Sequence, residues 1–204
     1  KCRIVEIKAR CSDVSRIREI LKSRRADFRG TDHQIDTYFR VPRGRLKLRE
    51  GQIENALIFY QRSNQKKSKR CDAFLYQCPE PDLMKKILNV AFGVLAVVDK
   101  MREIYFIKNV KFHIDQVKGL GRFVEIEAQG RTPECRITEL RRQCDHYRKL
   151  LGIAPEDLLA DSYAINSFVS DKIAGRHVCA GEEAGKLFFC GWHNRDDEFF
   201  VPDY

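Results

Sequence analysis

Several segments of the chain alternate strictly between hydrophobic and polar residues. In residues 2–10, Val5 and Ile7 alternate with Glu6 and Lys8, which is the period of a β-strand with one buried face. Alternation or β-rich composition predicts further strands over residues 35–41, 45–50, 56–62, 72–77, 95–107, 110–116 and 122–129. Most of the connections are short, so we expect the eight strands to be largely antiparallel.

Helical periodicity separates and follows these strands. It predicts helices over residues 12–25, with Ser12 as the N-cap, over 79–91, over 133–151 after Thr132-Pro133, and over 155–169. From about Gly175 the periodicity fades into a tail with aromatic residues. We therefore expect a main domain over residues 1–165 and an extension over 166–204 that docks on the barrel or on a partner.

Charged residues share one face of each predicted strand. Glu6 and Lys8 lie on one face of the first, as do Lys47 and Arg49 on the third, and hydrophobic residues fill the opposite faces. An open antiparallel sheet with one solvated face is the common explanation of such alternation. However, these faces contain almost no Ser, Thr or Gln, and cations dominate the middle strands while carboxylates lie on the first and last. Eight antiparallel strands also suit a closed barrel with a charged interior and helices outside.

A charged interior indicates a particular chemistry. Clustered Lys and Arg side chains in a low-dielectric cavity repel one another, so we expect a bound polyanion to neutralise them. Glu6, Glu125 and Glu127 supply oxygen ligands that suit Mg²⁺ or Mn²⁺. Cations for phosphoryl oxygens together with carboxylates for a metal are the components of triphosphate chemistry.

The overall charge agrees with an anionic partner. The 204 residues include 38 Lys and Arg against 29 Asp and Glu, a formal net charge of +9. The basic residues are spread along the chain without an RGG tract, zinc-finger spacing or lysine tail, so a small polyanion is a better partner than nucleic acid. No apolar run is long enough to span a bilayer, and no signal segment begins the chain. We expect a cytoplasmic protein and no membrane partner, and leave a homodimer open.

The eight cysteines are widely spaced and form no C-x-x-C motif. Reduced thiols are therefore a better interpretation than a disulfide framework. In the tail, His177, Cys179, Cys190 and His193 offer four zinc-ligating side chains. Because the chain is rich in Cys, we interpret this set as a coincidence.

Several motifs together resemble the CYTH family, the triphosphate tunnel metalloenzymes named after class IV adenylyl cyclases and thiamine triphosphatases. They are VEIKAR near the start, DTYFRVPRGRLKLRE, DKMREIYF and VKFHIDQVKGLGRFVEIE, in the family's order over residues 2–165. The resemblance implies an α+β fold, an eight-stranded antiparallel β-barrel whose central tunnel binds a triphosphate and a divalent metal.

The resemblance also implies roles for individual residues. The family's first-strand motif E-x-E-x-K falls on Ile4, Glu6 and Lys8, so an Ile stands at its first acidic position. The family's acidic positions for Mg²⁺ or Mn²⁺ match Glu6, Asp115, Glu125 and Glu127. Its basic positions for the phosphoryl oxygens match Lys8, Lys47, Arg49, Arg62, Lys100 and Arg102.

The leading functional hypothesis is metal-dependent hydrolysis of a triphosphate compound, inorganic or organic. A class IV adenylyl cyclase would use the same tunnel but needs a site for adenine, and no residue of the sequence identifies one. A non-catalytic sensor of polyphosphate or nucleotide stays open because of Ile4, and RNA binding by the basic surface is a further alternative.

Overall fold

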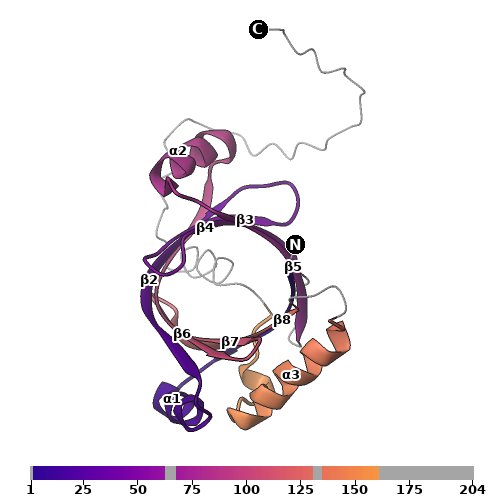
Figure 1. Ribbon diagram of the computed structural model, residues 1–204. Helices are drawn as coiled ribbons and strands as arrows, with labels where there is room; N and C mark the ends of the chain where they lie inside the picture. The colour runs from indigo at the N-terminus through magenta and orange to yellow at the C-terminus, as the bar shows by residue number, and fades with distance from the viewer. Residues whose placement is uncertain (1, 63–67, 131–134, 161–204) are drawn as a thin grey trace, which may run out of the picture.

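The structure is a computed structural model that describes residues 2–62, 68–130 and 135–160. Within them, eight strands pair antiparallel in the order β1-β5-β4-β3-β2-β6-β7-β8, and β8 pairs with β1 to close the ring (Figure 1). The strands are β1 (Cys2–Arg10), β2 (Asp27–Phe39), β3 (Arg45–Glu50), β4 (Ala56–Arg62), β5 (Lys69–Gln77), β6 (Val94–Ile107), β7 (Val110–Val117) and β8 (Gly121–Gly130). The predicted fold class is confirmed.

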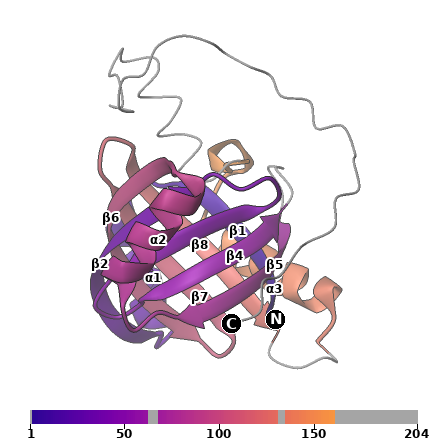
Figure 2. The ribbon, with the colours of Figure 1, turned by 90° about the horizontal axis from the view of Figure 1, so that it is seen from above.

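Three α-helices in the described part of the chain lie outside the ring: α1 (Val14–Ser23), α2 (Pro81–Phe92) and α3 (Ile137–Leu150). Figure 1 shows α1 and α3 on one side and α2 on the opposite side, and Figure 2 shows the strands slanting across the ring wall. No helix in the described ranges is long and apolar enough to cross a membrane.

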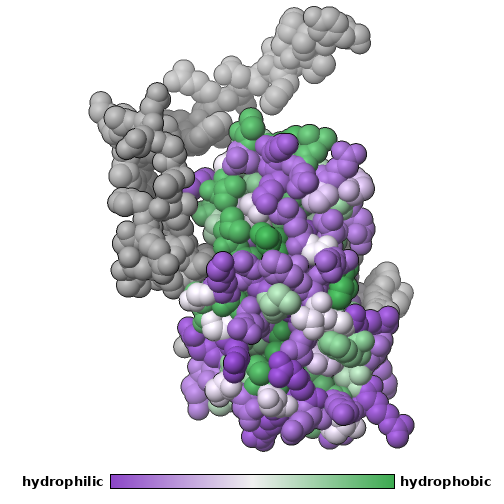
Figure 3. Space-filling view, turned by 90° about the vertical axis from the view of Figure 1, so that its left-hand side faces the viewer, coloured by the Kyte–Doolittle hydropathy of each residue, from purple (hydrophilic) through white to green (hydrophobic). Residues whose placement is uncertain are grey.

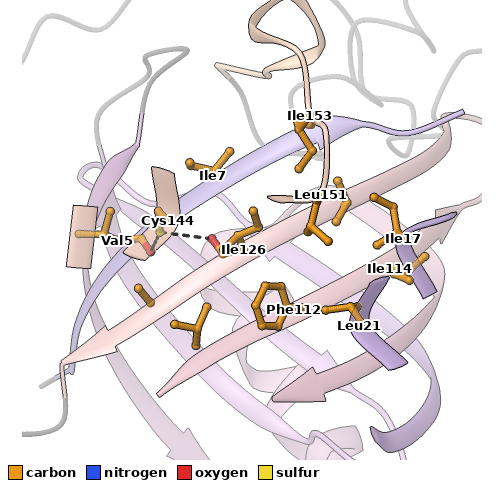
Figure 4. Packing of buried hydrophobic residues seen from close by; sticks show 14 of the residues in the cluster. Val5, Ile7, Ile17, Leu21, Phe112, Ile114, Ile126, Cys144, Leu151 and Ile153 are labelled. Carbon is orange, nitrogen blue, oxygen red and sulfur yellow. Dashed lines mark hydrogen bonds between the residues drawn. The ribbon is translucent and has the colours of Figure 1, made fainter. Parts of the chain in front are cut away.

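The largest hydrophobic core lies between the outer face of β1, β7 and β8 and the helices α1 and α3. Val5, Phe112 and Ile126 are fully buried there, with Leu21 of α1 beside Phe112 and Cys144 of α3 beside Val5 (Figure 4). The Cys144 thiol of α3 donates to the backbone oxygen of Val5 at 3.1 Å. The outward residues of these strands are therefore occupied in the core, which leaves the alternate residues to face into the ring.

A smaller core lies under α2. Leu88 packs with Phe39, Leu48 and Cys78. The opposite face of α2 exposes Leu83, Ile87 and Val90, and the hydrophobic residues visible in Figure 3 gather toward the end of the molecule that carries this helix. On the outer wall, α2 contacts β2 and β3 with its buried face and leaves its other apolar face exposed.

The element boundaries differ from the sequence prediction in a few places. β2 begins at Asp27 instead of residue 35, because Asp27–Gln34 pair with β6 although Phe28 is their one large hydrophobic residue. The N-cap of α1 is Asp13, whose side chain accepts from the backbone N–H of Arg16 at 3.0 Å, and α3 begins at Ile137. The part of 155–169 that is described holds a 3₁₀ turn at Pro155–Asp157 and a single bridge from Leu158 to Ala9.

The chain after this turn contacts one end of the ring. The ammonium of Lys69, at the start of β5, is buried and donates to the backbone oxygens of Leu159 at 2.6 Å and Ala160 at 2.7 Å. The backbone N–H of Leu159 donates to the backbone oxygen of Lys8 at 2.9 Å. Residues 158–160 are therefore held between β1 and β5.

Candidate active site

The inner face of the ring encloses a cavity of about 820 Å³, called here the tunnel cavity. The predicted site residues that line it are Glu6, Lys8, Lys47, Arg49, Lys100, Arg102, Glu125 and Glu127. Asp115 is fully buried in the wall, in contact with Arg102. Arg62 is the last residue of β4, and its side chain lies outside the described part of the structure. The period of two in the sequence thus brings residues from distant parts of the chain around one space.

Three of the cations converge on one carboxylate, Asp36 of β2. Asp36 accepts from the Nζ of Lys47 at 2.9 Å and from the Nζ of Lys100 at 2.5 Å. The guanidinium of Arg49 donates through Nε at 2.8 Å and Nη2 at 3.1 Å. Burial by itself would raise the pKa of Asp36, but the charges of Arg49, Lys100 and Lys47 hold it well below its usual value. Asp36 is therefore ionised and fixes the positions of Lys47, Arg49 and Lys100, although burial and the charges of Arg49, Arg102 and Lys47 lower the pKa of Lys100 itself well below its usual value.

A second buried network joins β6, β7, β8 and β1. Arg102 donates to both oxygens of Asp115 at 2.6 Å and to Glu125 at 3.0 Å. Glu125 also contacts the ammonium of Lys8 at 3.3 Å and the Nδ1 of His113 at 3.3 Å. Charge-assisted hydrogen bonds of this kind are short and directional, so Arg102 and Lys8 are held in place before any ligand binds.

These networks correct one expectation from the sequence. The signs are not segregated between strands, because Asp36 lies among the cations of β3 and β6, and Glu54 from the β3–β4 loop reaches Arg49 and Lys111. Lys8, Lys47, Arg49, Lys100, Arg102 and Lys111 are thus already paired with carboxylates of the chain. Any anion that entered the cavity would therefore have to compete with these carboxylates for the cations.

His113 is expected to make the free energy of unfolding depend on pH. Burial, together with the charges of Arg102 and Lys111, lowers the pKa of His113 to about 3. Between pH 6.5 and 3 the unfolded chain therefore binds a proton at this side chain that the folded protein does not bind. Each pH unit lost in that window should lower the free energy of unfolding by up to about 1.4 kcal/mol.

Urea unfolding of the wild type and His113→Gln at pH 7, 6 and 5 checks this expectation. The wild type should lose more stability than the variant, because Gln does not titrate. The buried carboxylates with lowered pKa values contribute their own loss only below about pH 4.5, so they do not disturb the comparison. If the free energy of unfolding fell equally with pH in the two proteins, His113 would not be the cause of the pH dependence.

Carboxylates meet at the β1–β8 pair. Glu6 and Glu127 are direct partners in the antiparallel register, and both line the tunnel cavity. Burial raises the pKa of Glu127, and the carboxylates of Glu125, Glu6 and Glu54 raise it further against the opposing effect of Lys111. Two carboxylates thus face the same part of the tunnel cavity, which is a suitable environment for a metal cation.

Another sector of the tunnel cavity is apolar. Inward residues of β4 and β5, with Ile4 of β1, form a wall without charge. Its members are Ile4, Ala56, Ile58, Tyr60, Cys71, Ala73 and Leu75. The ammonium of Lys47 lies 5.4 Å from the ring centroid of Tyr38 and 6.0 Å from that of Tyr60, so the apolar wall adjoins the cations.

Sequence reasoning missed several residues of the site. Asp36 and Tyr38 lie two residues apart on one face of the strand. This alternation could have indicated that Asp36 faces the inside of the ring. Lys111 alternates with Phe112 on the same face as His113 and Asp115, and its pairing with Glu127 places it in the tunnel cavity. Glu54 lies on a loop and Lys69 in a basic run, where the sequence has no periodicity to assign a face.

Other predictions fall on undescribed residues or concern cysteines. His177, Cys179, Cys190, His193 and the aromatic tail lie outside the described residues, as does the 166–204 extension. Cys11, Cys71, Cys78, Cys135 and Cys144 are free thiols.

Comparison with known proteins supplies a family and a fold. The model of the CYTH domain matches residues 3–163 of the chain. None of the curated proteins matches the sequence.

Among solved structures, the PH1012 protein of Pyrococcus horikoshii OT3 is 25% identical, with a TM-score of 0.63 over 79% of this chain and 98% of that one. A candidate adenylate cyclase of Vibrio parahaemolyticus is 20% identical, with a TM-score of 0.65 over 82% and 97%. An adenylyl cyclase candidate of Hippeastrum with a dominant triphosphatase activity is 12% identical, with a TM-score of 0.55 over 87% and 98%. At these low identities, the last two similarities show only that the two proteins share the fold of this chain.

Proposed function

Since this chain belongs to the CYTH domain family, we propose that it is a triphosphatase that hydrolyses the terminal phosphoanhydride bond of a triphosphate compound. One observation carries the proposal: Lys8, Lys47, Lys100 and Arg102 surround the same cavity as the paired carboxylates Glu6 and Glu127. Members of this family are triphosphatases or adenylate cyclases. A polyanion inside the ring could contact cations that come from several strands around the cavity.

The cations serve binding and transition-state stabilisation. An ammonium has three N–H donors, and Lys47 and Lys100 each give one to Asp36, so each has donors for a phosphoryl oxygen as well. Arg102 is held by Asp115 and Glu125 with its guanidinium at the cavity wall. Donors fixed in this way stabilise charge that develops on the phosphoryl oxygens as water attacks the terminal phosphorus in line.

The residues fit one divalent cation. CYTH tunnel enzymes generally use divalent metals, and we propose Glu6 and Glu127 as the ligands in this chain, with Glu125 beside them. Among the described residues no group of three or more His, Cys, Asp or Glu side chains is assembled to hold a metal ion. Mg²⁺ is commonly held by one or two carboxylates together with substrate phosphates and water. When bound, such an ion supplies charge neutralisation to the phosphoryl oxygens.

Asp115 has a different place in this proposal from that implied by the resemblance. Both of its oxygens accept hydrogen bonds from Arg102, and its side chain is fully buried. Burial would raise the pKa of Asp115, but the charge and hydrogen bonds of Arg102 lower it. We therefore assign Asp115 to positioning Arg102.

One observation favours a second candidate, cyclisation of ATP. The apolar wall of β4 and β5 adjoins the cations and offers a surface for an organic group such as a nucleobase. Cyclisation also needs the ribose 3′-hydroxyl held in line with the α-phosphorus, whereas hydrolysis needs only the cations, the metal and water. The residues placed around the tunnel cavity meet the simpler requirement, so hydrolysis is the first choice.

Product analysis separates the two. The protein is incubated with inorganic triphosphate, ATP or thiamine triphosphate, each with Mg²⁺ or Mn²⁺. Release of inorganic phosphate is the expected result. Cyclic AMP and pyrophosphate from ATP, without phosphate from inorganic triphosphate, would favour the cyclase, and binding of all three without turnover would favour a sensor.

A further inference from the structure

The β3–β4 loop carries a carboxylate into the tunnel cavity. Glu54 Oε2 accepts from Nη1 of Arg49 at 2.8 Å and from Nε2 of Gln34 at 3.0 Å, and Oε1 accepts from the ammonium of Lys111. Arg49 belongs to β3 and Lys111 to β7, with β2 and β6 between them in the ring. Two cations and an amide donor thus converge on one carboxylate that lines the cavity.

This set of donors is the kind that binds a phosphoryl group. Arg and Lys side chains together with a neutral N–H donor recur at phosphate sites. The combined charges of Arg49 and Lys111 lower the pKa of Glu54 far below its usual value, although burial alone would raise it. Glu54 is therefore an anion of the chain in a position suited to an anion of a ligand.

The loop is fixed at this position by a buried residue of β2. Asp32 is 1% exposed. It accepts from the backbone N–H groups of Gln52 at 2.8 Å, Ile53 at 3.1 Å and Glu54 at 3.0 Å. Gly51 passes so close that an added Cβ would lie 2.6 Å from Oδ2 of Asp32. The backbone that carries Glu54 is thus tied to the ring wall at three consecutive residues, so a ligand would not displace it readily.

We propose that Glu54 is a specificity-determining residue that closes the phosphate position between Arg49 and Lys111 and so restricts the tunnel cavity to short polyphosphates. The inference rests on the proposed function and deepens it. A phosphate chain held by Lys8, Lys47 and Lys100 would meet the charge and the bulk of Glu54 if it were extended toward this position. Removal of Glu54 makes two cations available to an additional phosphoryl group.

Calorimetric titration of the full chain without metal, in EDTA, tests the proposal with inorganic pyrophosphate, triphosphate and tetraphosphate. In Glu54→Ala, affinity for tetraphosphate should rise by at least about tenfold relative to triphosphate. Glu54→Gln, which removes the charge and keeps the bulk, should show a smaller gain of the same kind. Glu50→Gln is the matched control. Glu50 is a carboxylate at the end of β3, the strand of Arg49, but it pairs with Lys85 of α2 outside the tunnel cavity. It should leave all three affinities unchanged.

The outcomes separate this inference from the proposed function. Equal gains for the three ligands, or a loss for all of them in a variant with wild-type melting temperature, would overturn the assignment of Glu54. Glu54→Gln gives the answer if Glu54→Ala does not fold. If the wild type binds none of the polyphosphates and also fails to hydrolyse triphosphate with Mg²⁺ or Mn²⁺, the proposed function fails. If it hydrolyses triphosphate and neither variant gains selectively, only the inference is wrong.

Discussion

Glu127→Gln is expected to lower metal-dependent triphosphate hydrolysis by about two to three orders of magnitude. The amide has the shape of the carboxylate but lacks the charge that binds a divalent cation. The fold should be unaffected or slightly more stable at neutral pH, because the raised pKa of Glu127 shows that its ionised form is disfavoured in the folded protein.

Phosphate release measured over a titration of Mg²⁺ or Mn²⁺ checks this expectation. The variant should require more metal and reach a lower kcat. Asp99→Asn is the control, since Asp99 is a partly exposed carboxylate on the outer wall that contacts His33 at 2.8 Å. Wild-type activity of Glu127→Gln at ordinary metal concentrations would exclude Glu127 as a ligand.

Asp36→Asn should be among the most destabilising single substitutions in the ring, with a loss of about 3–5 kcal/mol in the free energy of unfolding. The variant keeps Lys47, Arg49 and Lys100 in a buried cluster but removes the charge that compensates them. The penalty comes from cations left without a counter-charge in a region of low dielectric constant.

Equilibrium unfolding in urea at pH 7 measures the loss. Asp99→Asn serves again as the comparison and should change stability by less than about 1 kcal/mol, as expected for an exposed pair. Triphosphate should restore more stability to Asp36→Asn than it adds to the wild type, because it supplies anions to the same cations. Equal losses for the two variants would mean that Asp36 is not the centre of the cluster.

The sequence predicted most of the ring because alternation or hydrophobic composition is visible in at least part of each of the eight strands. The first half of β2 could not be predicted, since Asp27–Gln34 contain one large hydrophobic residue, Phe28, and pair with β6 through tertiary context. The pairing of cations with carboxylates was also beyond the sequence. Periodicity assigns Lys47 and Asp36 to a face, but only the order of strands in the ring brings them together.

The β3–β4 loop shows the same limit at the site. Glu54 and Asp32 are 22 residues apart and belong to no periodic pattern, yet three backbone N–H groups of the loop reach one carboxylate. The conformation of this loop depends on the close approach of Gly51 to Asp32. That approach exists only in the folded chain, so the sequence alone does not reveal it.

The place of β1 in the ring has a consequence for synthesis of the protein. β1 pairs with β5 on one side and with β8 on the other. β1 is synthesised before the other strands of the ring and β8 after them, so the ring can close only when β8 is available. Contacts between residues so distant in the chain form slowly. Until then Glu6 and Lys8 stay in contact with water, and the hydrophobic outer face of β1 lacks α3. The nascent chain therefore passes through a long interval as an open sheet with two unpaired edges, the stage at which association with other chains competes with folding.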